Sequence, residues 1–167
     1  GIIGTGNIGK QVAALLRGFN LNIIATDIVP DEEWARTLGV EYTDIKSLCK
    51  RADFITLHAS GGDLLIGANE IELMHPTTVL VNCARGVLVD NRAVYKAVSE
   101  GRIYGYGIDE VWNYPDLPLT ADLNIAASPH IGSDTDQGKL RMQQLSAQAV
   151  IDYVDGKKPL YIVNEEE

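Results

Sequence analysis

The sequence predicts an α/β fold in which a parallel sheet carries helices on both of its faces. Short apolar runs rich in Ile and Val alternate with amphipathic stretches of helical length over all 167 residues. No sequence repeat or linker interrupts this alternation. A turn with three glycines follows the first apolar run, where a first strand would pass into a helix. Together these observations favour a doubly wound parallel sheet in a three-layer αβα domain.

The expected elements follow this alternation in order along the chain. The apolar runs predict strands at residues 2–3, 21–26, 40–42, 54–58, 78–82, 103–108 and 124–127. The amphipathic stretches predict helices at residues 7–17, 31–38, 44–50, 91–100 and 134–153. We expect Gly18 and Gly101 to end the first and fourth helices, and Asp44 to cap the third. The stretch 111–132 contains three prolines, and we interpret it as an irregular functional segment or a plain surface loop.

Net charge and cysteine content narrow the range of partners. A net charge of −9 and a pI near 4.7 argue against nucleic acid or an anionic membrane surface as the main partner. No apolar run approaches the roughly 18 residues that a membrane span requires. Cys49 and Cys83 have no metal-like spacing, so we expect reduced thiols, a cytoplasmic location and no metal.

The first ten residues, GIIGTGNIGK, contain the pattern G-x-G-x-x-G. Gly4 would permit the tight turn, Gly6 would let the backbone approach a pyrophosphate, and Gly9 would allow close strand–helix packing. Asp27 stands 18 residues beyond Gly9, at the end of the second apolar run, where an acid can bind the ribose hydroxyls of a dinucleotide. No Arg or Lys follows in the next three residues, so the pattern favours NAD over NADP in a Rossmann-type domain. The alternatives are an ordinary strand–helix turn and an acid that caps the next turn.

An arginine and a histidine each follow a predicted strand in the second half of the chain. Arg85 stands between two small residues after a buried strand, which places its guanidinium where a carboxylate or polarised carbonyl can bind. His130 follows the last strand, and its imidazole can donate or accept a proton near neutral pH. We interpret His58 as structural or adjacent to the cofactor, because strand ends in the first half surround the adenosine.

The ordered motifs together resemble the D-isomer-specific 2-hydroxyacid dehydrogenases, including the phosphoglycerate dehydrogenase branch. The segments that carry this resemblance are GIIGTGNIG, ATDIVP, DFITLH, LVNCARGVLVD, SEGRIYGYGID and SPHIGSDT. These segments stand in family order at near-family spacing, and the resemblance extends from Gly1 to about Asn164. The resemblance implies hydride transfer between NAD(H) and a 2-hydroxy acid or its 2-keto acid, and a homodimer formed through the nucleotide domain.

The same resemblance implies roles for individual residues. Arg85 would bind the carboxylate and carbonyl oxygen of the substrate, and His130 would be the general acid in reduction and the base in oxidation. Asp109 is similar to the family acid that holds the nicotinamide carboxamide, with a helix or turn cap as the alternative. The full set of expected cofactor-binding residues is Gly4, Gly6, Asn7, Ile8, Gly9, Asp27, His58, Ala59, Cys83, Ala84, Asp109 and Gly132.

Two local stretches depart from the family pattern. Relatives place a glutamate before a proline, where it pairs with the catalytic histidine and raises its pKa. Here that position falls on Tyr114 or Pro115, and the nearest acids are Glu110 and Asp116. The sequence leaves Tyr114, Glu110 and Asp116 open as the partner of the histidine. The stretch 57–71 is also shorter and richer in glycine than its family counterpart.

The largest departure concerns the second wall of the cleft. Members of the family build the substrate cleft between two domains, and the other domain comes largely from residues ahead of the first glycine turn. We therefore expect residues 1–155 to be the NAD-binding domain and residues 156–167 to lead back to a substrate domain outside this chain. A cleft with one wall does not exclude water, so we expect the fragment to be inactive alone. An NAD(H)-sensing regulatory module with impaired catalysis is the alternative function.

Overall fold

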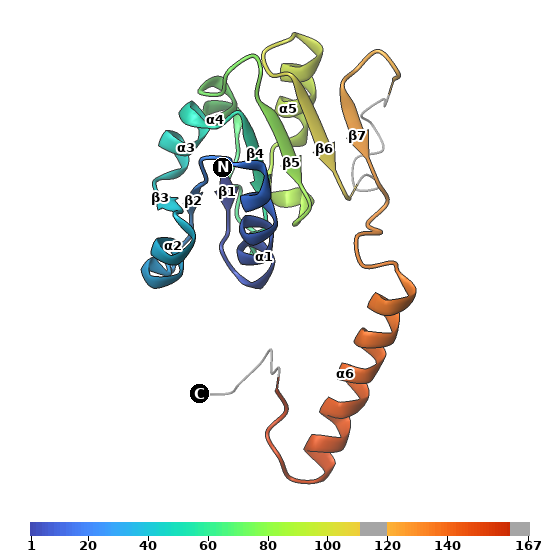
Figure 1. The fold of residues 1–167 in the computed structure, drawn as a ribbon. Coiled ribbons are helices and arrows are strands. Elements are labelled where there is room, and N and C mark those ends of the chain that lie inside the picture. The colour runs from blue at the N-terminus through green and yellow to red at the C-terminus, as the bar shows by residue number, and fades with distance from the viewer. Residues whose placement is uncertain (111–119, 161–167) are drawn as a thin grey trace. The chain divides into compact units, whose positions relative to one another are not determined.

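The computed structural model describes residues 1–110 and 120–160 of the chain. Contacts divide the chain into two compact units, Gly1–His130 and Ile131–Glu167. Among the described residues, the first unit contains a seven-stranded sheet of order β3-β2-β1-β4-β5-β6-β7, and every strand pair is parallel (Figure 1). The chain adds strands to one side of β1 first and then to the other, which is the doubly wound arrangement. The predicted fold class is confirmed.

The elements of this unit have the following bounds. The strands are β1 (Ile2–Ile3), β2 (Ile24–Thr26), β3 (Glu41–Tyr42), β4 (Phe54–Leu57), β5 (Val79–Asn82), β6 (Gly105–Ile108) and β7 (Ile125–Ala127). The helices are α1 (Asn7–Leu16), α2 (Glu32–Leu38), α3 (Ile45–Arg51), α4 (Ala68–Glu72) and α5 (Asn91–Ser99). Asp31, Asp44 and Asp90 cap α2, α3 and α5, because each side chain accepts a hydrogen bond from a backbone N–H of the first turn.

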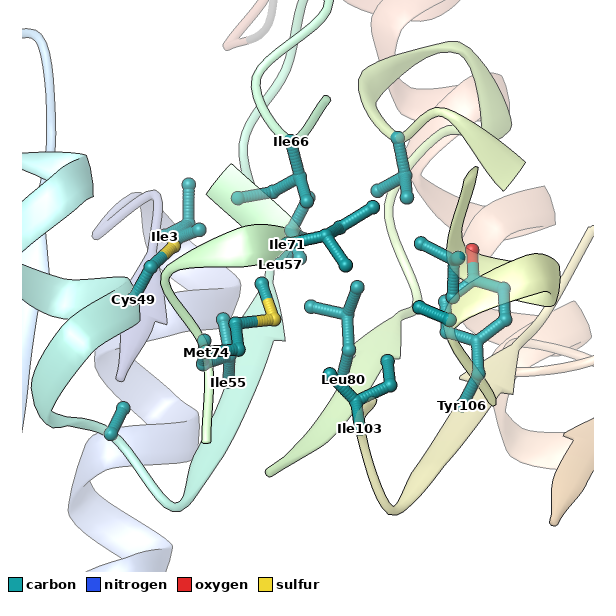
Figure 2. Packing of buried hydrophobic residues seen from close by; sticks show 14 of the residues in the cluster. Ile3, Cys49, Ile55, Leu57, Ile66, Ile71, Met74, Leu80, Ile103 and Tyr106 are labelled. Carbon is teal, nitrogen blue, oxygen red and sulfur yellow. The ribbon is translucent and has the colours of Figure 1, made fainter. Parts of the chain in front are cut away.

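Two hydrophobic clusters cover the two faces of the sheet. Successive residues of a strand point to opposite faces, and accordingly Ile3 belongs to one cluster and Ile2 to the other. The larger cluster joins the strands to α3, α4 and α5, and Figure 2 shows the buried side chains of this cluster meeting between strands and helices. The smaller cluster includes Ala13 of α1 and Ala35 of α2. Helices therefore pack on both faces, as the three-layer prediction requires.

Most elements differ from the expected bounds by one or two residues, and three differences are larger. Helix α1 continues as a 3-10 turn over Arg17–Phe19 and ends at Asn20, whose φ of 55° is left-handed, so Gly18 does not end it. Strand β2 begins at Ile24 rather than at residue 21. Helix α4 was not expected, because its five residues lie in a glycine-rich stretch and are too few to display helical periodicity.

The second unit contains one long helix, α6 (Asp136–Val154). Thr135 caps it, because its hydroxyl accepts a hydrogen bond from Gly138 N at 3.0 Å. None of its residues is buried, and Leu140, Val150 and Tyr153 are exposed apolar side chains on it. Within residues 1–110 and 120–160, no helix combines the length and the apolar character that crossing a membrane requires.

Candidate functional site

The glycine turn lies between β1 and β4, where the strand order reverses and where open α/β sheets bind ligands. Gly4 has a φ of +91°, and a Cβ placed on it would stand 2.5 Å from Ala59 N, so only glycine fits. A Cβ on Gly9 would stand 2.0 Å from Gly4 O, because α1 packs directly against the turn. A Cβ on Gly6 would meet nothing within 4 Å. Packing explains two of the three glycines, and the third leaves open space beside the helix.

A cavity of about 300 Å³ lies beside this turn, within the size range of small-molecule sites. Its lining includes five of the expected cofactor-binding residues, namely Gly4, Gly6, Asp27, His58 and Ala59. A larger cavity of about 430 Å³ lies at the amino ends of the strands, and residues such as Ile23 and Phe54 line it. We place the cofactor in the smaller cavity, because the glycine turn and the end of β2 meet there.

Asp27 is held in place by donors from two segments. Its Oδ2 accepts hydrogen bonds from Thr5 N at 2.5 Å and from Thr5 Oγ1 at 3.0 Å, and its Oδ1 accepts one from Val29 N at 2.9 Å. Burial by itself would raise the pKa of Asp27, but these donors together hold the pKa below its ordinary value. The carboxylate is therefore ionised and oriented at the edge of the cavity.

Residues at the end of β4 line this cavity, and the first turn of α1 follows directly after the glycine turn. Asn7 and Ile8 are exposed in the first turn of the ten-residue helix α1, and no acid occupies that turn. Its backbone N–H groups and dipole favour an anion. His58 Nε2 lies 3.0 Å from Thr56 Oγ1, and burial lowers the pKa of His58. The cavity, the uncrowded Gly6 and the oriented Asp27 carboxylate fit a dinucleotide.

Arg85 stands on a loop whose backbone is fixed by buried side chains. Asn82 is 2 % exposed; its Oδ1 accepts from Ala84 N at 3.0 Å and its Nδ2 donates to Arg85 O at 2.8 Å. Asn91, also buried, donates to Gly86 O at 2.9 Å. The Arg85 side chain is exposed, and one guanidinium nitrogen donates to Ala84 O at 3.0 Å. The loop therefore presents a cation beyond the carboxyl end of β5.

The ends of β5, β6 and β7 are joined to one another by hydrogen bonds. Asp109 N donates to Asn82 O at 3.1 Å, and Ser128 Oγ donates to Asp109 Oδ1 at 2.5 Å. Cys83 is exposed and Ala84 is partly buried at the end of β5. His130, two residues after Ser128, is exposed and has a left-handed φ of 55°. A non-glycine residue in this conformation is uncommon and is often found at functional sites.

Of the three residues left open as the partner of His130, the structure describes only Glu110. The Glu110 carboxylate accepts a hydrogen bond from Gly86 N, beside Arg85, so Glu110 contributes to the arginine loop. Tyr114 and Asp116 lie outside the described residues. Gly132, the last of the expected cofactor-binding residues, lies in the second unit.

Sequence reasoning missed three polar residues that fix the site, namely Thr5, Asn82 and Ser128. Thr5 occupies a variable position of the glycine pattern, Asn82 ends a strand, and Ser128 precedes the proline before His130. Their positions next to a motif were the available signal. Their partners could not be read from sequence, since Thr5 and Ser128 each bond to an acid about twenty residues away.

The chain is similar to known proteins over nearly its whole length. The family described as D-isomer specific 2-hydroxyacid dehydrogenase, NAD binding domain, matches residues 1–132. A glyoxylate reductase of Korarchaeum cryptofilum is 36 % identical over 99 % of this chain and 52 % of its own length. A D-3-phosphoglycerate dehydrogenase of Methanocaldococcus jannaschii is 38 % identical over 98 % of this chain and 32 % of its own length. The chain thus spans about half or less of these relatives.

A solved structure supports the same assignment. The D-isomer specific 2-hydroxyacid dehydrogenase of Lactobacillus delbrueckii ssp. bulgaricus, in its NAD-complexed form, superimposes with a TM-score of 0.85 at 29 % identity. The match covers 98 % of this chain and 55 % of that one. The family description also confirms the predicted cofactor, NAD. The chain belongs to the D-isomer specific 2-hydroxyacid dehydrogenase family, as its NAD-binding domain.

Proposed function

We propose that this chain is the nucleotide-binding part of an oxidoreductase that transfers a hydride between NAD(H) and a 2-hydroxy acid or its 2-keto acid. One observation carries the proposal. Asp27, Arg85, Asp109 and His130 all lie beyond the carboxyl ends of strands in one parallel sheet. These strand ends meet at one edge of the sheet, which is the edge at which α/β folds bind ligands. That edge therefore carries an acid suited to a ribose, a cation suited to a carboxylate, and an imidazole.

In this proposal the cofactor occupies the cavity beside the glycine turn. Gly4, Gly6, Asn7, Ile8 and Gly9 hold the pyrophosphate, since Gly4 and Gly6 line that cavity and α1 begins directly after them. Asp27 binds the adenosine ribose, and His58 and Ala59 line the same cavity. Cys83, Ala84 and Asp109 contact the rest of the cofactor. When bound, NAD supplies the carbon that accepts or donates the hydride.

The substrate is held by Arg85, whose planar fork binds the carboxylate and polarises the carbonyl. His130 gives a proton to the carbonyl oxygen during reduction and takes it back during oxidation. Glu110 fixes the Arg85 loop through its bond to Gly86 N. The Ser128–Asp109 hydrogen bond holds the segment before His130 against the end of β6.

A calorimetric titration of this chain with NAD and with NADP tests the cofactor site. We expect NAD to bind and NADP to bind more weakly, because the ionised Asp27 repels a 2′-phosphate. Asp27→Ala should weaken NAD binding by about 10- to 100-fold, the range for a hydrogen bond to a charged group. Asp53→Ala, at an exposed acid lining the other cavity, should change nothing. Preference for NADP, or unchanged binding by Asp27→Ala, would overturn the assignment.

Turnover by the full-length protein tests the reaction. Glyoxylate with NADH and D-3-phosphoglycerate with NAD are the first substrates to try, since relatives carry the names glyoxylate reductase and D-3-phosphoglycerate dehydrogenase. His130→Ala should lower kcat by about 10²- to 10⁴-fold, the range for removal of an acid–base group, and His75→Ala should not. Binding of NADH without turnover of any 2-keto acid would favour the alternative, an NAD(H)-sensing regulatory module.

The remaining expectations concern the whole protein. We propose that residues 1–155 form the NAD-binding domain, that residues 156–167 lead to a substrate domain, and that the protein is a homodimer. The family resemblance supports these points, and light scattering of the full-length protein tests the dimer. A cytoplasmic location agrees with the free thiols of Cys49 and Cys83, and cell fractionation tests it.

A further inference from the structure

Tyr42 and Thr5 form a polar contact between β3 and the glycine turn. Tyr42 OH lies 2.7 Å from Thr5 Oγ1 and accepts a hydrogen bond from Asp31 N at 3.2 Å. Thr5 is 4 % exposed, and its hydroxyl also lies 3.0 Å from Asp27 Oδ2. The Tyr42 ring lies against Trp34, with ring centroids 6.3 Å apart. The tyrosine is thus fixed by its neighbours and reaches Asp27 only through Thr5.

The direction of these hydrogen bonds follows from proton counting. A threonine hydroxyl has one proton, and an ionised carboxylate only accepts. The proton of Thr5 is therefore committed to Asp27 Oδ2, which means that Tyr42 is the donor in its contact with Thr5. Since Tyr42 OH in turn accepts from Asp31 N, every donor points toward Asp27. Such a one-way chain polarises each of its members and strengthens the last bond.

We propose that Tyr42 and Thr5 are positioning residues for NAD: Tyr42, acting through Thr5, orients the Asp27 carboxylate toward the adenosine ribose. The inference rests on the proposed role of Asp27. Without the Tyr42 hydroxyl, Thr5 Oγ1 loses its donor, so the Thr5 O–H is less polarised and less firmly oriented, and its hydrogen bond to the Asp27 carboxylate weakens. The backbone bonds from Thr5 N and Val29 N remain. The effect is thus one of orientation rather than loss of the carboxylate.

The inference assigns a nucleotide-recognition role to a strand that does not line the cavity. Strand β3 is one of the two edge strands of the described sheet, and Tyr42 is absent from the cavity lining, which includes Asp27 and Thr26. A purely structural tyrosine would change the stability of the chain without regard to which ligand is offered. An orienting tyrosine changes the affinity only for ligands with ribose hydroxyls. This difference separates the two roles.

The test uses Tyr42→Phe in this chain, with calorimetric titration by NAD and by the NAD analogue whose adenosine ribose is 2′,3′-dideoxy. We expect Tyr42→Phe to weaken NAD binding by about 3- to 10-fold, within the range of one hydrogen bond. Binding of the dideoxy analogue should change by less than about 2-fold, since it lacks the hydroxyls that Asp27 reads. Tyr104→Phe makes the same chemical change at an exposed tyrosine and should affect neither ligand.

Variants of Thr5 give an independent arm. Thr5→Val removes the hydroxyl at nearly constant volume and should reproduce the ligand-selective loss, and Thr5→Ser should restore NAD affinity. The double variant Tyr42→Phe/Thr5→Val should bind NAD no more weakly than Thr5→Val alone, because both changes interrupt the same series of hydrogen bonds to Asp27. Thermal melts of each variant report whether the fold is retained.

The outcomes separate this inference from the proposed function. If Asp27→Ala binds NAD like the parent chain, the ribose role of Asp27 fails and the inference fails with it. If Asp27→Ala loses affinity while Tyr42→Phe does not, only the positioning role is overturned. Equal weakening of NAD and of the dideoxy analogue by Tyr42→Phe would mean that Tyr42 is structural. A loss confined to NAD supports the inference.

Discussion

At the β2 end of the carboxyl edge, the side chain that we propose to bind the cofactor is fixed: Thr5 and Val29 hold both oxygens of Asp27. At the β5 end, the backbone is fixed instead. Asn82 holds the backbone on both sides of the peptide that links Ala84 to Arg85, while the guanidinium is exposed. The first end has an oriented acceptor, and the second has an oriented loop with an adaptable cation.

This difference matches what each end is proposed to bind. A cofactor presents the same ribose each time, so a preorganised acceptor lowers the cost of binding. A substrate that also contacts a second domain benefits from an arginine that can adjust, provided that its loop is rigid. The contrast implies that changes at the β5 end alter turnover and not cofactor affinity, and that changes at the glycine turn alter cofactor affinity or the fold.

The largest effect should come from Arg85→Ala, which tests whether a change at the β5 end alters turnover without altering cofactor affinity. We expect kcat/KM of the full-length protein to fall by about 10²- to 10⁴-fold, since one partner of a charged pair is removed. The affinity of this chain for NAD should stay within about 2-fold. Arg85→Lys should recover only part of the activity, because lysine lacks the planar fork. A matching loss of NAD affinity would show that the two ends are not separable.

The next largest effect should appear when alanine replaces each of two glycines of the same turn, Gly9 and Gly6, and the stability and NAD affinity of the two variants are compared. Gly9→Ala should destabilise the chain by about 3 kcal/mol or more, because its Cβ would stand 2.0 Å from Gly4 O. Gly6→Ala should keep stability within about 1 kcal/mol, since its Cβ meets nothing within 4 Å, and should weaken NAD binding at least about tenfold. Urea unfolding and calorimetry measure the two quantities. Equal stability of the two variants would contradict the packing role of Gly9.

Sequence reasoning predicted the elements and residues whose cause is local. The glycine turn, the apolar strands and the cap of α3 by Asp44 each follow from a few neighbouring residues. Asp27 was found for the same reason, because it ends an apolar strand at a fixed distance from the glycines. Helix α4 was missed, since its five residues are shorter than two turns of any periodic pattern.

Contacts across the sheet could not be predicted from the sequence. Tyr42 reaches Thr5 over 37 positions, and the hydroxyl of Tyr106 on β6 donates to Asn91 in α5 over 15. Neither pair has a sequence signal, because each contact depends on which strands, helices and turns become neighbours in the fold. The residues that carry chemistry could thus be proposed from motifs, whereas those that orient them required the structure.

An effect of intermediate size on stability should follow from Asn91→Ala, which removes the side-chain hydrogen bonds that hold the backbone after Arg85. Asn91 donates to Gly86 O at 2.9 Å and Val89 O at 2.8 Å and accepts from Tyr106 OH at 2.5 Å. Leaving these buried groups unpaired should cost about 2–3 kcal/mol of unfolding free energy. Tyr106→Phe removes one of the three bonds and should cost about 1 kcal/mol. Urea unfolding measures the loss of unfolding free energy in each variant. Equal losses would contradict the conclusion that Asn91 holds this backbone through all three hydrogen bonds.

The smallest effect concerns the pH dependence of stability at the cofactor end. Burial lowers the pKa of His58 below its ordinary value of 6.5. As the pH falls through about 6.5, His58 therefore binds a proton more readily in the unfolded chain than in the folded chain. The free energy of unfolding consequently decreases as the pH falls. The Gly1 amine acts in the same direction, because burial lowers its pKa from 8.0 to about 6.

The contribution of His58 is isolated by comparing the parent chain with His58→Gln, which leaves the Gly1 amine unchanged. We expect the unfolding free energy of His58→Gln to decline less steeply between pH 7 and pH 5, since the titrating group is gone. His75→Gln, at an exposed histidine, is the matched control and should keep the parent slope. Urea unfolding at several pH values measures the slopes. If His58→Gln and the parent decline in parallel, the histidine at the end of β4 does not resist protonation, and the cofactor cavity is more open to water than its geometry indicates.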